Sequence, residues 1–298
     1  MRKRLRILTL LLLVLSTHHL FAQNKVKSHD GTIVTIPAKP KIVSLGGAIT
    51  EILYALGMGD AIVGVDVSST YPEPAKHKTN VGYWRNLNAE AILALQPNLI
   101  LTTSEAGPAA VFGQLKKAGI AVVVVDAKYT TANAKAKIRL LAQAVSKVQR
   151  GDELVAELER DLAAADKLST GAKTSPSVLF IYARGQSLLL ASGKNTPSDG
   201  ILPLAKARNA VTQFYGVKPL TSESVVASRP DIILMTSGGM ASLGGIDGVL
   251  KIPGVALTPA GKSRRIVEID DLLLLGFSPR CGKAVQELLT ILHPEIQK

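Results

Sequence analysis

Cysteine, aromatic side chains and histidine are all scarce in this chain of 298 residues. Cys281 is the single cysteine, which excludes a framework of disulfide bonds and any zinc or iron–sulfur site that needs several cysteines. After the first 22 residues, histidine occurs only as His29, His77 and His293, too far apart in the sequence to predict a metal site made of a histidine cluster. Aromatic residues make up only 4% of the chain, so any place where they gather is informative.

The short motifs of common enzymes and nucleotide-binding proteins are also absent. There is no GxSxG, no HExxH, no Walker A loop and no GxGxxG after a predicted strand. The glycine pairs Gly46-Gly47, Gly238-Gly239 and Gly244-Gly245 have the spacing of turns and not that of a loop that cradles a diphosphate. The sequence therefore gives no reason to expect catalysis or a bound nucleotide.

Only one long hydrophobic run is present, and it has the pattern of a secretory signal peptide. Four basic residues precede the apolar run Ile7–Leu15, and Ala22 is a small residue at a plausible cleavage point. The run is shorter than the roughly 20 apolar residues that a membrane-spanning helix needs. We therefore expect residues 1–22 to be a signal peptide. Because no cysteine lies near Ala22, we expect no lipid anchor on the exported protein.

Basic residues outnumber acidic ones, which gives a formal net charge of +12, or +8 once the four basic residues of the signal peptide are removed. The basic residues are dispersed and form no repeating basic helix, so the sequence does not favour a nucleic-acid partner. An excess of positive charge also suits a small ligand that carries several negative charges.

Short apolar strands alternate with helical patterns along the first half of the chain. The predicted strands are 41–45, 61–65, 99–102 and 121–125, and the predicted helices between them are 48–56, 89–95 and 109–118. Buried strands separated by helices are typical of a parallel sheet that is covered on both faces. We therefore expect an α/β lobe over residues 23–149.

One unit of this pattern occurs twice. LNAEAILALQPNLILTTS at 87–104 aligns without a gap with LTSESVVASRPDIILMTS at 220–237, at an offset of 133 residues and with eight of 18 positions identical. Each copy reads as a turn, a short helix, a proline stop and a buried strand. The repeat predicts a second, similar lobe over residues 170–298. Because paired α/β lobes often meet around a ligand, we expect two Rossmann-like lobes with central parallel sheets and a ligand cleft between them.

Between the two lobes, residues 131–170 have a helical pattern throughout. Ile138 and Leu141 lie on one face at helical spacing, Gly151 is expected to interrupt the helix, and Leu154 continues the apolar face. We expect a long, rigid helix over 150–169 to join the lobes. Such a rod, unlike a Gly/Ser linker, would let the lobes open and close only modestly.

The segment 66–90 follows a predicted strand, where open α/β sheets bind their ligands, and it concentrates aromatic side chains. Tyr71, Tyr83 and Trp84 are three of the seven tyrosine and tryptophan residues of the chain. A phenolate oxygen is a good ligand for ferric iron, and tyrosine serves as an axial ligand of haem. An exposed loop tyrosine that packs on the neighbouring prolines fits the same residues. Arg85 fits either a carboxylate partner or a solvated surface charge.

Four segments carry a resemblance to a known family: IVSLGGAITEILYALG at 42–57, VGVDVSSTYPEPA at 63–75, VGYWRNLNAEAILALQPNLIL at 81–101 and LLLLGFSPRCGKAVQEL at 272–288. The chain resembles the helical-backbone class of periplasmic substrate-binding proteins of ABC importers, which includes cobalamin- and ferrisiderophore-binding proteins. Within that class it is most similar to the periplasmic haem-binding proteins of bacterial haem uptake systems. The resemblance implies a monomeric periplasmic protein that captures haem and delivers it to an inner-membrane ABC permease.

Taken residue by residue, the resemblance implies that Tyr71 in STYP is the axial ligand of the haem iron. It also implies that Glu90 and Glu223 dock onto basic pockets of the permease. Both glutamates lie in the first turn of a predicted helix, where an acidic side chain also stabilises the helix dipole. The side chains expected to line the ligand are Tyr83, Trp84 and Tyr182, and those expected to meet the haem propionates are Arg85, Arg184 and Arg280.

Two positions depart from some of these relatives. Some hold a second haem through a histidine in the second lobe, but no histidine lies between His77 and His293, so we expect no second haem held in that way. Some have an arginine two residues after the ligand tyrosine, where this chain has Glu73. Because a carboxylate there disfavours a phenolate, we expect another donor, Arg85 or Arg184, to serve Tyr71.

Two alternatives stay open at this point. The first is a ferrisiderophore or a corrinoid as the ligand; a siderophore site needs no axial tyrosine. The second is an exported enzyme on a nitrogenase-like two-lobed scaffold, which requires titratable side chains that converge in the cleft. Such an enzyme would place Asp66, Glu73 and His77 within hydrogen-bond reach of one another.

Overall fold

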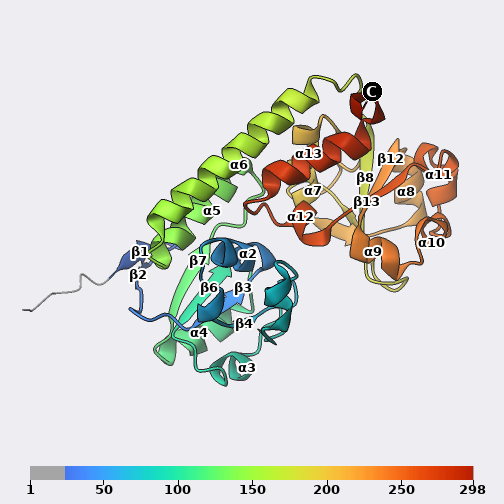
Figure 1. Ribbon diagram of the computed structural model, residues 1–298. Coiled ribbons are helices and arrows are strands. Elements are labelled where there is room, and N and C mark those ends of the chain that lie inside the picture. Colours follow the sequence, from blue (N-terminus) through green and yellow to red (C-terminus); the bar gives the residue numbers. More distant parts are fainter. Residues whose placement is uncertain (1–23, 298) are drawn as a thin grey trace, which may run out of the picture.

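Two β-sheets, each with its own helices, form two lobes that are joined by the long helix α6 (Val148–Ser169), as Figure 1 shows. The computed structural model describes residues 24–297, so the predicted signal peptide at 1–22 lies outside the described residues. We call the elements that precede α6 the N-terminal lobe and those that follow it the C-terminal lobe. The two-lobed α/β fold that the sequence predicts is confirmed.

The N-terminal lobe contains a five-stranded sheet in the order β5-β4-β3-β6-β7, in which all neighbouring strands are parallel. All four residues of β3 are buried, because helices cover both faces of the sheet. The strands are β3 (Ile42–Leu45), β4 (Ile62–Val65), β5 (Thr79–Asn80), β6 (Leu99–Thr103) and β7 (Ala121–Val125), preceded by the antiparallel hairpin β1 (Lys25–Lys27) and β2 (Ile33–Thr35). The helices are α2 (Gly47–Ala55), α3 (Ala89–Leu93), α4 (Ala109–Lys117) and α5 (Thr131–Ala144), with the 3₁₀ turns η1 (Gly59–Ala61) and η2 (Glu73–His77).

The C-terminal lobe contains a sheet in the order β11-β9-β8-β12-β13, with β10 also paired to β8. The strands β8, β10, β12 and β13 are parallel, as predicted, whereas β9 is antiparallel to both β8 and β11, because β9 follows β8 after a short turn instead of a crossover helix. The strands are β8 (Ser177–Ala183), β9 (Leu189–Ser192), β10 (Arg208–Asn209), β11 (Val217–Pro219), β12 (Ile232–Thr236) and β13 (Ile266–Ile269). The helices are α7 (Pro197–Ile201), α8 (Ser222–Ser228), α9 (Ser237–Ser242), α10 (Ile246–Leu250), α11 (Pro259–Lys262), α12 (Asp271–Leu275) and α13 (Cys281–Leu292), with the turns η3 (Leu202–Ala205), η4 (Val255–Leu257) and η5 (Pro294–Gln297).

The internal repeat has the same local structure in both lobes. Helices α3 and α8 are each followed by a left-handed residue at the matched position, Gln96 with φ 49° and Arg229 with φ 41°. Two positions later, Asn98 accepts a hydrogen bond at 2.7 Å from the backbone N–H that precedes β3. Its counterpart Asp231 accepts one at 2.8 Å from the backbone N–H of Ser177, at the start of β8. The repeat therefore preserves both the turn and the side chain that ties two neighbouring strands together.

The joining helix begins earlier than predicted, and the break in the helical segment is elsewhere. Helices α5 and α6 are separated at residues 145–147, where Ser146 has φ 56°. Gly151, predicted to interrupt the helix, lies inside α6, and a Cβ added to it would come within 2.3 Å of the Cβ of Ala142. The glycine thus allows α5 and α6 to approach closely. On its other side α6 packs against α13 of the C-terminal lobe, so it contacts both lobes along its length.

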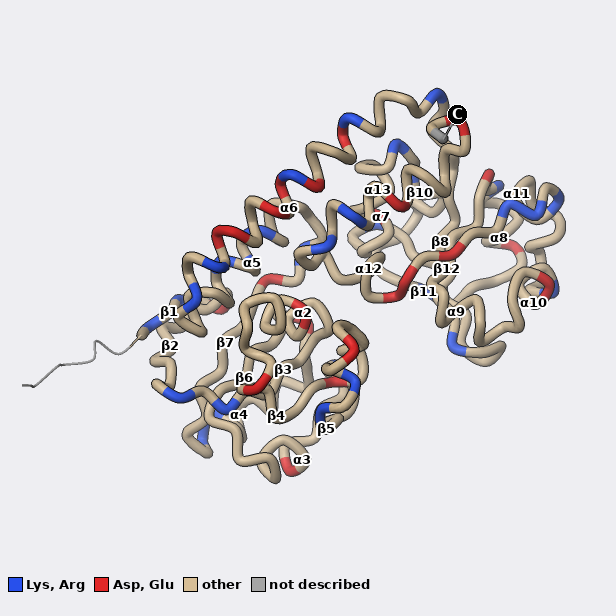
Figure 2. The backbone as a smooth tube through the Cα atoms, in the orientation of Figure 1, with Lys and Arg blue, Asp and Glu red and all other residues tan. Residues whose placement is uncertain are grey.

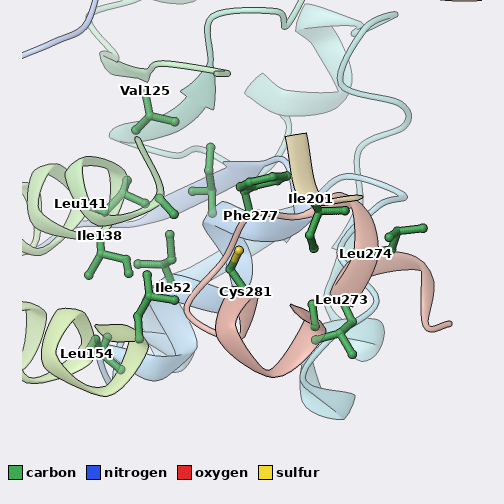
Figure 3. Packing of buried hydrophobic residues seen from close by; sticks show 14 of the residues in the cluster. Ile52, Val125, Ile138, Leu141, Leu154, Ile201, Leu273, Leu274, Phe277 and Cys281 are labelled. Carbon is green, nitrogen blue, oxygen red and sulfur yellow. The ribbon is translucent and has the colours of Figure 1, made fainter. Parts of the chain in front are cut away.

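One buried hydrophobic cluster runs through both lobes. It includes Ile52 of α2, Leu141 of α5, Leu154 of α6, Phe277 of the segment between α12 and α13, and Cys281, the first residue of α13 (Figure 3). Moving the lobes apart would expose this surface to water at a cost of roughly 25 cal/mol per Å². The continuous core therefore opposes a wide separation of the lobes.

Charged residues of both signs are interspersed along α6, as Figure 2 shows. Arg150, for example, pairs with Glu153 at 3.1 Å and with Glu157 at 2.9 Å. This pattern is typical of a helix face in contact with water. Within residues 24–297, no helix is both long enough and apolar enough to cross a membrane.

Candidate functional site

Most of the side chains predicted to form the ligand site lie at the carboxyl ends of parallel strands, where α/β sheets bind ligands. In the N-terminal lobe, Tyr71 follows β4, and Tyr83 to Arg85 follow β5. In the C-terminal lobe, Tyr182 lies near the end of β8, Arg184 follows that strand, and Arg280 precedes α13. We call these residues the interlobe cluster: Tyr71, Tyr83, Trp84, Arg85, Tyr182, Arg184 and Arg280.

The loop that carries Tyr71 is held at its start by a buried carboxylate. Asp66 is 1% exposed, and it accepts hydrogen bonds from the backbone N–H of Gly46 at 2.8 Å and from the N–H and hydroxyl of Ser68 at 2.9 and 2.6 Å. The hydroxyl of Ser69 donates to it at 3.1 Å. These bonds fasten the loop to the start of α2.

The arrangement expected for an exported enzyme is not present. Asp66 is occupied by its four hydrogen bonds, and in the described part of the chain no hydrogen bond joins it to Glu73 or His77. Glu73 instead pairs with Lys76 at 2.7 Å. The hydrogen bond from Lys76 lowers the pKa of Glu73, so the negative charge beside Tyr71 in the sequence is balanced locally.

Arg280 covers the ring of Tyr71. The guanidinium carbon lies 3.6 Å from the ring centroid, and the Tyr71 side chain is still 42% exposed. Among residues 24–297, this ring contact is the interaction found for Tyr71, and its hydroxyl makes no hydrogen bond. We expected Arg85 or Arg184 to donate to the Tyr71 hydroxyl, and that expectation stays a prediction. In this structure both arginines contact other partners, and Arg280 lies over the Tyr71 ring without a hydrogen bond to its hydroxyl.

Arg280 itself is held by a carboxylate of the other lobe. Glu51 of α2 is 3% exposed and accepts hydrogen bonds from Arg280 Nε at 3.0 Å and from Nη2 at 2.9 Å. The hydroxyl of Ser278 also donates to Glu51, at 2.7 Å. Burial lowers the pKa of Arg280, and the bonds to Glu51 outweigh that effect, so its pKa is raised and it stays charged.

Arg85 forms a second cluster of contacts with aromatic residues and a carboxylate. Its guanidinium carbon lies 3.7 Å from the Trp84 ring centroid, it donates to the Tyr83 hydroxyl at 3.0 Å, and it forms an ion pair with Glu105. Glu105 also accepts from the hydroxyl of Tyr129 at 3.2 Å. Burial, with the negative charge of Glu105 next in importance, raises the pKa of Tyr129 to about 12.

Glu105 and Tyr129 were not predicted as site residues, although the sequence contained a signal for them. Each follows closely the end of a predicted strand, the same position that drew attention to segment 66–90. What the sequence could not supply was their partner, since Arg85 is 20 residues before Glu105. Tyr129 also packs on Phe277 of the C-terminal lobe, with the ring centroids 5.9 Å apart.

The C-terminal lobe contributes a second tyrosine with an arginine over its ring. The guanidinium carbon of Arg184 lies 4.7 Å from the centroid of Tyr182, and Arg184 pairs with Asp271 at 2.9 Å. Burial raises the pKa of Tyr182, and the nearby Tyr83 contributes in the same direction. Tyr83 and Tyr182 are therefore close enough to interact electrostatically, although they belong to different lobes.

Each of the three arginines expected to meet ligand carboxylates already has a carboxylate partner in the protein. The pairs are Arg85–Glu105, Arg184–Asp271 and Arg280–Glu51. For Arg280 the expected role stays a prediction: Glu51, which is buried, occupies the Nε–Nη2 edge of its guanidinium, and the Arg280 side chain is 20% exposed. Arg85 and Arg184 have side chains 45% and 46% exposed, which leaves both accessible to a ligand.

Glu90 and Glu223, predicted to dock onto a permease, are both exposed. They lie in the first turns of α3 and α8, whose N-caps are Asn88 and Thr221.

Two surface concavities, of about 550 and 280 Å³, involve none of the interlobe cluster. In the part of the chain that the structure describes, no group of three or more His, Cys, Asp or Glu side chains could hold a metal ion.

The fold and the site define a two-lobed substrate-binding protein, and comparison with known families agrees. Residues 42–273 match the periplasmic binding protein family, so the chain belongs to that family. Among curated proteins, it is 33% identical to an uncharacterized ABC transporter substrate-binding lipoprotein, YvrC of Bacillus subtilis (strain 168), over 89% of this chain and 84% of that protein. It is 32% identical to a vitamin B12-binding protein of Pectobacterium atrosepticum, over 65% of this chain and 71% of the relative.

Solved structures of similar proteins share the fold over 86–87% of this chain. The periplasmic heme-binding protein RhuT from Roseiflexus sp. RS-1, in apo form, is 42% identical with a TM-score of 0.83, covering 87% of this chain and 100% of that chain. BhuT, described as a periplasmic heme-binding protein in complex with two hemes, is 37% identical with a TM-score of 0.80, covering 86% and 99%. HutB of Vibrio cholerae, a periplasmic heme-binding protein, is 32% identical with a TM-score of 0.75, covering 86% and 100%.

Proposed function

We propose that this protein captures haem between its two lobes in the periplasm and delivers it to an inner-membrane ABC permease. The observation that carries the proposal is Tyr71: an exposed phenol at a strand end, with a free hydroxyl and a cation fixed over its ring. Tyrosine is a known axial ligand of haem iron. The solved structures named heme-binding, at up to 42% identity, support the same ligand class.

The residues around Tyr71 have separate tasks in this proposal. Tyr71 ligates ferric iron, while Tyr83, Trp84 and Tyr182 contact the apolar faces of the porphyrin, which favours binding by roughly 25 cal/mol per Å² buried. Arg85 and Arg184 bind the propionates. Each arginine either keeps its present carboxylate partner and adds a propionate, or replaces that partner with a propionate. No bond is made or broken in the cargo, so the protein has no catalytic role.

Delivery requires the permease to recognise both lobes. Glu90 and Glu223 are the docking residues, and release follows when docking moves the lobes apart. We propose that the protein acts as a monomer, is exported by the signal peptide at 1–22 and holds one haem, since it lacks a histidine between His77 and His293. The absence of a lipid anchor stays a prediction, and one relative is named a lipoprotein.

A corrinoid is the second candidate ligand, because several relatives are named vitamin B12-binding proteins. The two ligands make different demands on the site. Haem carries two carboxylates and an iron that accepts a phenolate, which match the arginines and Tyr71. A corrinoid bears amide side chains and makes no use of a phenolate ligand.

Trp84 makes the test direct, because it is the only tryptophan of the chain and lies in the interlobe cluster. Its fluorescence is measured while mature protein is titrated with haemin, with cyanocobalamin or with a ferric hydroxamate siderophore, each corrected for ligand absorption. We expect saturable quenching by haemin at one equivalent and no saturation with the other two. Saturation by cyanocobalamin or the siderophore, with none by haemin, overturns the proposal in favour of that ligand.

A further inference from the structure

Arg280 links the two lobes at the point where Tyr71 stands. Glu51 in α2 and Tyr71 after β4 belong to the N-terminal lobe, whereas Arg280 precedes α13 in the C-terminal lobe. The three side chains form a chain of contacts: Glu51 accepts hydrogen bonds from Nε and Nη2, one edge of the guanidinium, at 3.0 and 2.9 Å, and the guanidinium carbon lies 3.6 Å from the Tyr71 ring centroid. An arginine from one lobe thus contacts two residues of the other.

The hydrogen bonds to Glu51 fix the orientation of the guanidinium. Two parallel hydrogen bonds to one carboxylate define both the position and the plane of an arginine head group. Ser278 occupies the Glu51 oxygen Oε1 as well, at 2.7 Å, so the carboxylate is itself held. Because Glu51 is 3% exposed, loss of Arg280 would leave a buried carboxylate without its cation, which is strongly unfavourable.

A second contact holds the same segment against the N-terminal lobe. The Lys137 ammonium of α5 lies 3.4 Å from the carbonyl oxygen of Gly276 and 3.5 Å from that of Phe277. These residues immediately precede Ser278, and Arg280 follows two residues later. The segment 276–280 is therefore fixed to the N-terminal lobe at both ends, by a lysine and by a glutamate.

We propose that Arg280 is a positioning residue that makes the binding strength of Tyr71 depend on contact between the lobes; this inference rests on the proposed haem function. With the lobes together, the guanidinium orients the ring, leaves the hydroxyl free and stabilises the negative charge of a phenolate bound to ferric iron. With the lobes apart, Arg280 leaves with the C-terminal lobe and Tyr71 loses both effects. Docking that separates the lobes therefore weakens the iron–phenolate bond at the same moment.

The variants that test this are Arg280→Gln, Arg280→Lys and Glu51→Gln. Arg264→Gln is the matched control, because Arg264 also pairs with a carboxylate, Asp247, but on the exposed surface away from the cluster. We measure haemin transfer to apomyoglobin and the position of the tyrosinate-to-iron charge-transfer band. Arg280→Gln and Glu51→Gln should speed haemin loss by about tenfold and shift the band. Arg280→Lys should lie between them and wild type, since lysine keeps the charge but not the paired hydrogen bonds.

The outcomes separate this inference from the proposed function. If Arg280→Gln transfers haemin at the wild-type rate and keeps the wild-type charge-transfer band, the positioning role is overturned. Faster loss of haemin with an unshifted band also overturns it, because that result indicates a purely structural role. If wild type itself binds no haemin, the proposed function fails. The contact that Arg280 makes between the lobes is then tested on ligand-free protein by small-angle X-ray scattering. There, a radius of gyration in Arg280→Gln equal to that of wild type overturns the link. If Arg280→Gln fails to fold, Arg280→Lys and Glu51→Gln supply the same readouts.

Discussion

Glu90 and Glu223 lie 133 residues apart and occupy the same position in the two copies of the internal repeat. Each is exposed in the first turn of a short helix, α3 or α8, and each helix begins at a polar N-cap, Asn88 or Thr221. Both lobes therefore present one carboxylate at an equivalent point. Such an arrangement fits a partner that offers two equivalent basic sites.

Replacing both glutamates should separate transport from binding. In Glu90→Ala with Glu223→Ala, we expect haemin affinity to stay at the wild-type value, because neither side chain contacts the interlobe cluster. Permease-dependent haem uptake should fall by about tenfold or more, as expected for loss of two charged contacts. Glu153→Ala with Glu159→Ala, which removes two exposed carboxylates of α6, is the control. Undiminished uptake in the Glu90/Glu223 variant rules out this docking role.

Glu105 should compete with the ligand for Arg85. Because Glu105→Gln removes the negative charge and keeps an acceptor for the Tyr129 hydroxyl, it frees Arg85 for a propionate. We expect haemin affinity to rise about two- to fivefold, the value of one exposed ion pair. Equilibrium titration by Trp84 fluorescence measures it, with Asp247→Asn as the control for loss of a surface carboxylate. An affinity that is unchanged or lower contradicts the exchange of partners at Arg85.

Lys137 should make stability depend on pH between about 8 and 10.5. Burial lowers its pKa from 10.5 to about 8. The unfolded chain binds this proton more tightly than the folded one, so below pH 8 the buried charge costs stability, on the order of 3 kcal/mol. That cost disappears as the pH rises from 8 to 10.5.

Lys137→Met therefore should be more stable than wild type at pH 7, and the difference should shrink as the pH rises toward 10. The loss of the long contacts to the carbonyls of Gly276 and Phe277 offsets part of the gain. Urea denaturation of both chains at pH 7 and pH 10 measures the difference. A difference that is the same at both pH values contradicts a lowered pKa at Lys137.

Gly151 should be required for close packing of α5 on α6. Gly151→Ala places a methyl group 2.3 Å from the Cβ of Ala142, and overpacking of this kind typically costs about 1–3 kcal/mol. Ala142→Gly in the same chain removes the clash, so the double variant should recover part of the lost stability despite a second glycine in a helix. Thermal and urea unfolding report both values. If Ala142→Gly makes the double variant still less stable, the clash is not the cause.

The sequence was sufficient for the fold class, for the repeat and for the loop that carries Tyr71, because these depend on local patterns. Apolar strand runs, proline stops and the spacing of 133 residues are visible without any knowledge of distant contacts. The helix break near Ser146 was missed because glycine is the usual sign of a break. Gly151 serves instead for close packing, which depends on a neighbouring helix.

The partners of the site arginines could not be predicted, because they are far away in the sequence. Glu51 and Arg280 are 229 residues apart, and Arg184 and Asp271 are 87 apart. A single sequence shows that an arginine follows a strand but not which carboxylate it meets after folding. This is why the contacts of Arg280 with Glu51 and with the Tyr71 ring were not predicted.

The most direct test of the account is an absorption titration of mature wild type, Tyr71→Phe and Tyr215→Phe with haemin. Tyr215 is the control, because it is 73% exposed and its ring contacts Lys194 instead of the interlobe cluster. The account predicts saturation at one equivalent with a tyrosinate-to-iron charge-transfer band in wild type and Tyr215→Phe, and loss of that band in Tyr71→Phe. A band of undiminished strength in Tyr71→Phe would contradict the account, because the iron would then be bound by another residue.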